Sequence, residues 1–427
     1  MSAPTYIHVI RKSAIAEHAT LEHDPSTLGP LSPGLVRARA ALVSLTYNTL
    51  TYARLGTLRN WWDAFPVPQD LPAPYGDRSQ YGICPCWGWG TVIESRLEGI
   101  KPGLVMWGYW PLSGAPVNLQ LVDGGAPGHL VEVSDQRKTL MPMYNRYVIR
   151  DASVRLDNLT STRAELLGLE AVFRPVWECG YLLNKYVLGE PFIHPAGREG
   201  PPDQPWAKEK GDLTSAVVVA LSAGGRTACS FLDGLLKTRE AGTGPLGLLA
   251  ITGSALDKLV NDGRIPTKVI RYNAISDPTT MHWVAQLKPQ KILIVDFGGR
   301  EGSGAVLAEA LDRHMPSTDC LTIGVGTSAT VRTLDETLRQ LKKGSALPNR
   351  VQMNTGPVRD FVVESTGTEA YFQSAGMGWA AFVERGNLDA VTLVWGEGVK
   401  GARGLEGGWE MACKAELPAE AALVYRL

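Results

Sequence analysis

One stretch of the chain decides the fold: Val217-Val218-Val219-Ala220-Leu221-Ser222-Ala223-Gly224-Gly225-Arg226-Thr227-Ala228. An apolar run leads into a turn of small residues, and an amphipathic stretch from Cys229 to Lys237 follows. This order is typical of a buried strand, a phosphate-binding loop and the start of a helix. The usual G-x-G-x-x-G pattern is only partly kept, because Ser222 stands at the first glycine, Gly224 at the second and Thr227 at the third.

Strands and helices alternate through the middle of the chain. We expect strands at 216–221, 246–252, 268–272, 291–297 and 319–325, and helices at 227–237, 255–260, 281–287, 303–313, 335–343 and 368–385. Such alternation predicts a doubly wound parallel sheet. Residues 5–150 instead contain short strands broken by proline and glycine, and the tail returns to strands at 390–395 and 421–425. The predicted domains are therefore 1–165, completed by about 370–427, and 166–369.

Composition excludes several classes of protein. The 427 residues carry a formal net charge of −1, so the chain lacks the excess of basic residues typical of nucleic-acid-binding proteins. No apolar run approaches the roughly 20 residues that a membrane helix needs, and the N-terminus has no signal-peptide pattern. Six cysteines without framework spacing favour reduced thiols, so we expect a cytoplasmic protein with a small-molecule partner.

The organisation resembles the medium-chain dehydrogenase/reductase superfamily, in which a GroES-like β domain surrounds a Rossmann domain. The chain is most similar to a family in or beside that superfamily described only as a domain of unknown function. The segments that carry this resemblance are 47–56, 62–66, 85–90, 107–111, 143–147, 173–176 and 222–228. The resemblance implies an α/β fold that pairs a GroES-like β-rich domain with a Rossmann sheet. Dimers are common in the superfamily, so a homodimer is expected by analogy.

The loop and the second strand together indicate the cofactor. Ser222, Gly224 and Gly225 leave room for a pyrophosphate at a helix N-terminus, Arg226 can pair with a phosphate, and Thr227 should crowd the helix against the strand. NAD-binding proteins place an acid at the end of the second strand, but this strand ends in Ala250-Ile251-Thr252-Gly253-Ser254. NADP-dependent quinone-reductase relatives hold the 2′-phosphate with a similar Ser, Lys and Tyr, and the matching residues are Ser254, Lys258 and Tyr272. The sequence thus predicts NADPH, with Thr252 also contributing.

Comparison with the superfamily also bears on the glycines that follow the later strands and on whether the protein binds zinc. Gly298 and Gly324 follow apolar strands whose carboxyl ends should face the nicotinamide, although ordinary turn glycines would look the same. A catalytic zinc needs a clustered thiolate, imidazole and further ligand. No His or Glu stands near Cys86, where the superfamily's Gly-His-Glu segment would fall, so no metal is expected.

Metal-free reductases of the superfamily often use a tyrosine as proton donor. Tyr52, Tyr109 and Tyr144 lie in segments expected to line the cleft, and Asn48 and Thr51 are placed to orient a carbonyl. Trp62, Trp89 and Trp110 belong to a cluster of tryptophans expected to bind substrate, with core packing as the alternative.

The sequence leads to a zinc-independent, NADPH-dependent oxidoreductase that reduces an enoyl or carbonyl group of a bulky apolar molecule, such as a specialised metabolite. Two alternatives remain open at this stage. One is a non-redox cyclase, isomerase or lyase on a repurposed dehydrogenase fold, and the other is a binding protein without turnover. The altered third glycine favours these alternatives, whereas Ser254, Lys258 and Tyr272 favour NADPH.

Overall fold

A computed structural model describes residues 5–150, 156, 161–198, 200–253, 263–300, 302–326, 333–343, 347–389, 391–417 and 421–427. The chain divides into two compact units. The β-rich unit comprises Met1–Pro175, Ala329–Lys342 and Leu388–Leu427, and the α/β unit comprises Val176–Ser328 and Lys343–Asn387. The first unit boundary lies ten residues beyond the expected position 165. Among the described residues, no helix has the length and apolar character needed to cross a membrane.

A six-stranded parallel sheet forms the centre of the α/β unit. Its strands are β11 (Ala216–Leu221), β12 (Gly247–Ile251), β13 (Thr267–Ile270), β14 (Lys291–Asp296), β15 (Asp319–Gly324) and β16 (Arg350–Gln352). They lie in the order β13-β12-β11-β14-β15-β16, and all neighbours are parallel. This is the 3-2-1-4-5-6 order of a dinucleotide-binding sheet, with its switch point between β11 and β14. Every residue of β11 is buried, as a central strand covered on both faces requires.

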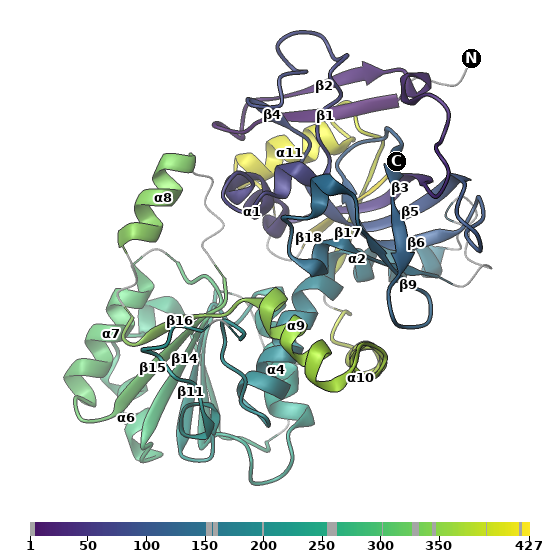
Figure 1. Cartoon of the computed structure of the whole chain (residues 1–427). Helices are drawn as coiled ribbons and strands as arrows, with labels where there is room; N and C mark the ends of the chain where they lie inside the picture. Colours follow the sequence, from purple (N-terminus) through teal and green to yellow (C-terminus); the bar gives the residue numbers. More distant parts are fainter. Residues whose placement is uncertain are drawn as a thin grey trace. The chain divides into compact units, whose positions relative to one another are not determined.

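Helices connect these strands and cover the sheet. They are α4 (Arg226–Asp233), α6 (Pro278–Gln286), α7 (Ser303–His314), α9 (Thr355–Thr366) and α10 (Thr368–Glu384), with the short α3 (Lys208–Gly211) and the 3-10 turn η7 (Tyr272–Ala274). Figure 1 shows α6 and α7 on one side of the sheet and α4 on the other. The helix α2 (Ser161–Leu182) continues through Pro175 and ends in the π-helical turn η5 (Leu183–Val187), and α4 ends in a second π-helical turn, η6 (Gly234–Thr238). The expected helix 255–260 lies outside the described residues.

Two antiparallel sheets build the β-rich unit. The smaller contains β1 (Thr5–Arg11), β2 (His18–His23) and β4 (Tyr81–Gly82). The larger has nine strands, β3 (Val36–Leu45), β5 (Pro85–Ser95), β6 (Val105–Pro111), β7 (Val117–Leu119), β8 (Leu121–Asp123), β9 (His129–Glu132), β10 (Arg146–Ile149), β17 (Thr392–Glu397) and β18 (Ala421–Arg426). Because β18 pairs with β3, the tail completes the sheet of the N-terminal unit.

Short helices and 3-10 turns complete the secondary structure of this unit. They are α1 (Tyr47–Leu55), α8 (Leu334–Lys343), α11 (Leu405–Cys413) and the 3-10 turns η1 (Pro25–Leu28), η2 (Trp61–Ala64), η3 (Asp135–Arg137) and η4 (Pro142–Asn145). The helix α1 begins in a capping box formed by Thr46 and Thr49. Its residues pack on β5, where Cys84, just before the strand, donates its thiol hydrogen to the Thr49 carbonyl at 3.4 Å.

Candidate functional site

The loop between β11 and α4 has the backbone shape of a phosphate-binding turn. Ser222 has a φ of +67°, the left-handed conformation that the first glycine of the fingerprint supplies in other proteins. Ala223 N–H donates to the Ile251 carbonyl at 2.9 Å, which ties the loop to the end of β12. Gly225 precedes the first turn of α4, and no side chain caps this end of the helix. Exposed Gly224 and Gly225 and half-buried Arg226 and Thr227 thus form an anion-accepting helix start.

A cation–π pair, Arg300 over Tyr272, lies beside the end of the second strand, β12. Thr252 is buried, and its N–H donates to the Ile270 carbonyl at 3.0 Å. The Arg300 guanidinium lies over the Tyr272 ring at 4.9 Å, and a Cβ added to Gly253 would lie 2.9 Å from Arg300 Nη2. A positive charge therefore stands beside β12, where NAD-specific proteins carry an acid. Ser254 and Lys258, predicted to share this role, lie outside the described residues.

Sequence reasoning missed Arg300. It follows Gly298-Gly299 in the loop after β14, where an exposed polar residue is common in any turn. An exposed arginine in a strand-end loop was the available signal, but nothing in the sequence showed that its side chain reaches Tyr272.

The Asp296 carboxylate at the end of β14 binds both the loop that follows this strand and the first residue of β16. Asp296 Oδ1 accepts hydrogen bonds from the Gly298 and Gly299 N–H groups, both at 3.0 Å. Its Oδ2 accepts from Arg350 Nη1 at 2.7 Å. The Arg350 guanidinium lies so close to Gly324 that a Cβ there would be 2.2 Å from Nη2. The predicted cofactor residues Gly298 and Gly324 therefore shape a fixed rim at the carboxyl edge of the sheet.

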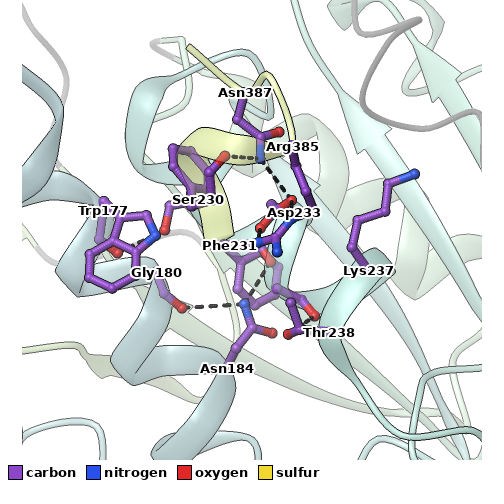
Figure 2. A network of polar contacts seen from close by, with 12 residues as sticks. Trp177, Gly180, Asn184, Ser230, Phe231, Asp233, Lys237, Thr238, Arg385 and Asn387 are labelled. Atoms are coloured by element: carbon purple, nitrogen blue, oxygen red, sulfur yellow. Dashed lines mark hydrogen bonds and ion pairs between the residues drawn. The ribbon is translucent and has the colours of Figure 1, made fainter. Parts of the chain in front are cut away.

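The C-terminal half of α4, remote from the loop that precedes the helix, is held by side-chain hydrogen bonds (Figure 2). Asp233 is 3% exposed and accepts from Arg385 Nε at 2.9 Å, from Arg385 Nη2 and from Asn387 Nδ2 at 2.9 Å. Ser230 Oγ donates to the Trp177 carbonyl at 2.7 Å. These contacts fix α4 to α2 and to the end of α10.

Close helix packing occurs one turn beyond the position expected from the fingerprint. Asn184 Nδ2 donates to the Phe231 carbonyl at 2.6 Å, and a Cβ at Gly180 would lie 2.5 Å from Ser230 Oγ. The glycine that permits the close approach therefore lies on α2. Thr227 stands in the first turn of α4, half-buried.

Four of the five predicted catalytic residues, Tyr52, Tyr109, Tyr144 and Asn48, meet in one cluster, whereas Thr51 makes its contacts elsewhere on α1. The Tyr52 ring centroid lies 5.2 Å from that of Tyr109 and 5.8 Å from that of Tyr144. The Tyr52 hydroxyl accepts hydrogen bonds from Trp87 Nε1 at 2.7 Å and Asn48 Nδ2 at 2.8 Å. Burial, and secondarily Tyr144, raises the pKa of Tyr52 well above its usual value, so the phenol keeps its proton at neutral pH. Thr51 donates to the Tyr47 carbonyl at 3.3 Å and accepts from Arg54 at 3.2 Å.

The three tryptophans predicted to bind substrate lie in the interior of the β-rich unit. Trp62 is 3% exposed, whereas Trp89 and Trp110 are fully buried. Trp89 Nε1 donates to the Leu167 carbonyl at 3.0 Å, and Trp110 packs edge-on against Tyr147. In this state they are core residues, and a substrate role stays a prediction. Trp61, which belongs to the same cluster of tryptophans in the sequence, packs on Tyr52 with ring centroids 4.9 Å apart.

Cys86 in β5 and Cys84 just before it lie in surroundings that disfavour metal binding. Cys86 Sγ donates to the Trp110 carbonyl at 3.3 Å, and burial raises the thiol pKa values of both Cys84 and Cys86 well above normal. A thiol must lose its proton to bind zinc, and this environment opposes that loss. In the described part of the chain, no group of three or more His, Cys, Asp or Glu side chains is arranged to hold a metal.

A β-rich unit completed by the tail and a Rossmann sheet together are the fold of the medium-chain dehydrogenase/reductase superfamily. The fold class and the resemblance predicted from the sequence are therefore confirmed. Within that fold, the chain belongs to the family described as Protein of unknown function (DUF2855), whose model matches residues 43–418. No curated protein sequence matches the chain.

Solved structures show the same fold at low sequence identity. The chain is similar to a mitochondrial 2-enoyl thioester reductase heterodimer from Candida tropicalis, with 11% identity, 100% of each chain covered and a TM-score of 0.53. It is also similar to a protein from Bacillus thuringiensis assigned as an NADPH:quinone reductase, with 11% identity, 100% of each chain covered and a TM-score of 0.50. At this identity the likeness establishes the fold, and function must be argued from residues.

Proposed function

We propose that this protein is a zinc-independent, NADPH-dependent oxidoreductase that reduces an enoyl or carbonyl group of a bulky apolar small molecule. The observation that carries the proposal is the Arg300–Tyr272 pair beside β12, next to a phosphate loop at the head of a 3-2-1-4-5-6 sheet. A guanidinium that stacks on an aromatic ring and keeps its N–H donors is suited to a 2′-phosphate. The two structural neighbours named above are reductases by their titles, which supports the same class.

The residues present fit the cofactor. Ser222 to Thr227 would hold the pyrophosphate, Arg300 and Tyr272 the 2′-phosphate, and the rim of Gly298 and Gly324 the nicotinamide end; Thr252, Ser254 and Lys258 belong to the same proposed set. When bound, NADPH supplies hydride to the substrate. In the β-rich unit, Tyr52 is the proposed proton donor, because Trp87 and Asn48 both donate to its oxygen and orient its remaining proton. Tyr109 and Tyr144 surround it, and Thr51 completes the proposed set.

Titration of the purified protein with NADPH and NADH, followed by calorimetry, tests the cofactor. We expect NADPH to bind at least about tenfold more tightly than NADH, since a charge-assisted hydrogen bond contributes about 1.5–3 kcal/mol. Arg300→Ala should reduce NADPH affinity about tenfold and leave NADH affinity nearly unchanged. Arg313→Ala is the matched control, because Arg313 pairs with Glu309 on the exposed face of α7.

Absence of NADPH binding at millimolar concentration would overturn the proposal, as would equal losses for both nucleotides in Arg300→Ala. If NADPH binds but is not consumed with any enone or ketone of a broad panel, the non-redox alternative takes its place. For each compound, consumption of NADPH is measured as the loss of its nicotinamide absorbance.

A further inference from the structure

Two arginines share a single buried carboxylate in the β-rich unit. Glu170, on α2, is 4% exposed and accepts hydrogen bonds from Arg174, one turn further along the helix, and from Arg150, which follows β10. Two guanidinium cations and one carboxylate carry a net charge of +1, and among the described residues neither arginine pairs with a second acid. The Arg150 and Arg174 side chains are 38% and 24% exposed, so this charge reaches the surface.

Both guanidinium groups lie over indole rings, which hold them in place. Arg150 Cζ is 4.9 Å from the centre of the Trp89 ring, and Arg174 Cζ is 5.3 Å from that of Trp107. Arg174 donates to Glu170 through Nη1, and within the described residues its Nε and Nη2 have no hydrogen-bond partner. Neither nitrogen is a buried atom that lacks a partner, so both are accessible to solvent or to a ligand. Nε and Nη2 form the edge of a guanidinium that binds a carboxylate through two parallel hydrogen bonds.

Arg174 is connected through stacked rings to the side chains around Tyr52. Trp107 stacks on Trp87, with ring centroids 4.8 Å apart and an angle of 20° between the ring planes. Trp87 Nε1 in turn donates to the Tyr52 hydroxyl at 2.7 Å. Trp87 and Tyr52 are buried, whereas Trp107 and Arg174 are half-buried. This aromatic cluster therefore becomes accessible at Trp107 and Arg174, where it also carries its positive charge.

We propose that the substrate of this protein carries a carboxylate, which Arg174 binds through Nε and Nη2. The inference rests on the proposed function, because it takes Tyr52 as the residue beside the reacting carbonyl. Glu170 does not cancel the attraction, since two guanidinium groups already share its charge, and the remaining charge of +1 matches a single carboxylate. The half-buried Trp107 indole supplies an apolar surface beside it. The substrate class is thus an enone or ketone with an apolar body and one acid group remote from the reacting carbonyl.

Two matched enones test the inference in the full-length protein: benzalacetone with a carboxylate on its ring, and the methyl ester of the same acid. With NADPH present, the KM of the acid should be about tenfold lower than that of the ester, the usual scale of a charge-assisted hydrogen bond. The two kcat values should be similar, because a remote carboxylate is bound equally in the ground and transition states. Arg174→Met keeps an apolar stem over Trp107, so it should raise the KM of the acid about tenfold and leave that of the ester unchanged.

A binding measurement without turnover separates this inference from the proposed function. The saturated analogue of the acid, titrated by calorimetry without NADPH, should bind about tenfold more weakly to Arg174→Met than to the wild-type protein. Arg11→Met is the matched control and should change nothing, because Arg11 forms an exposed ion pair with Glu17 in the same unit. Far-UV circular dichroism shows whether the variants fold, and the comparison of acid with ester in the wild-type protein needs no variant.

Equal KM values for acid and ester in the wild-type protein would overturn the substrate class and leave the reductase function standing. The same holds if a folded Arg174→Met variant reduces and binds the acid as well as the wild-type protein does. If no enone consumes NADPH but the saturated acid binds and its binding requires Arg174, the reductase function fails and the carboxylate site is supported.

Discussion

At the scale of single residues, the proposed phosphate loop keeps the backbone conformation of a glycine at a position where the residue is Ser222. Ser222 adopts a φ of +67°, which disfavours any residue with a Cβ by about 1–2 kcal/mol. The fingerprint is therefore altered in sequence but kept in backbone geometry. Strain of this kind concentrates at functional sites, which agrees with the proposed phosphate loop.

Ser222→Gly should stabilise the protein by about 1 kcal/mol, because glycine adopts this φ without steric conflict. The midpoint of urea unfolding measures the change. Ser222→Ala is the matched control and should give no gain, since alanine keeps the Cβ. A lower midpoint for Ser222→Gly would show that the Ser222 side chain stabilises the loop by more than the strain it imposes.

Tyr52→Phe tests the proposed proton donor at the same scale. The turnover number for enone or ketone reduction should fall about 10²–10⁴-fold, the usual contribution of a positioned acid, while NADPH affinity stays the same. Because the pKa of Tyr52 is raised, wild-type activity should not fall between pH 7 and 9 through ionisation of this group. Tyr75→Phe is the control, since Tyr75 packs on Tyr81 outside the Tyr52 cluster. Unchanged turnover in Tyr52→Phe would assign the proton to another group.

At the scale of elements, α4 is the helix that carries the proposed site. Its first turn presents backbone N–H groups, and its last turn is fixed by Asp233 to Arg385 and Asn387. Because Arg385 is about a third exposed, its pairing with Asp233 is partly screened and less valuable than a fully buried pair.

Asp233→Asn should lower the free energy of unfolding by about 2 kcal/mol and weaken NADPH binding, because it leaves Arg385 without its carboxylate and loosens α4. Urea unfolding and calorimetric titration measure the two effects. Glu309→Gln removes an exposed ion pair on α7 and should change stability by less than about 0.5 kcal/mol. If both variants behave alike, the Asp233 network does not position the helix.

At the scale of the whole molecule, buried phenols and thiols set the response to alkali. Burial raises the pKa values of Tyr52, Tyr109, Tyr147 and Tyr371, which occur in both units, and of Cys84 and Cys86. In the unfolded chain, thiols ionise near pH 8.5 and phenols near pH 10. Above these values the unfolded state binds fewer protons than the native state, so stability falls as pH rises.

The urea midpoint should therefore be nearly constant from pH 7 to 8 and then decrease, most steeply above about pH 10. Each group contributes at most about 1.4 kcal/mol per pH unit in that range. The ultraviolet absorbance of ionised tyrosine should increase over the same pH range in which the protein unfolds. Gradual ionisation of all 13 tyrosines in the folded protein would contradict this account.

The sequence predicted the central strands well and the short elements poorly. The bounds of β11 match the expected 216–221, because an unbroken Ala/Val/Leu run has one clear interpretation. The three-residue β16 and the helices α1, α9 and α11 were not expected, since they are too short or too evenly mixed in polarity to produce a period. The apolar run 119–121 within the β-rich segment belongs to two strands that separate at Gln120, whose N–H donates to Glu132 Oε1 at 3.2 Å.

By itself the sequence determined the fold class, and it placed a strand, a turn of small residues and a helix start at 216–228, because hydrophobic period and turn chemistry are local properties of the chain. Only the tertiary structure decided which side chains meet. Arg385 and Asp233 are 152 positions apart, and Arg350 and Asp296 are 54 apart. The Arg300–Tyr272 pair is another contact of this kind. Such contacts follow from the packing of whole elements, so no local pattern in the sequence predicts them.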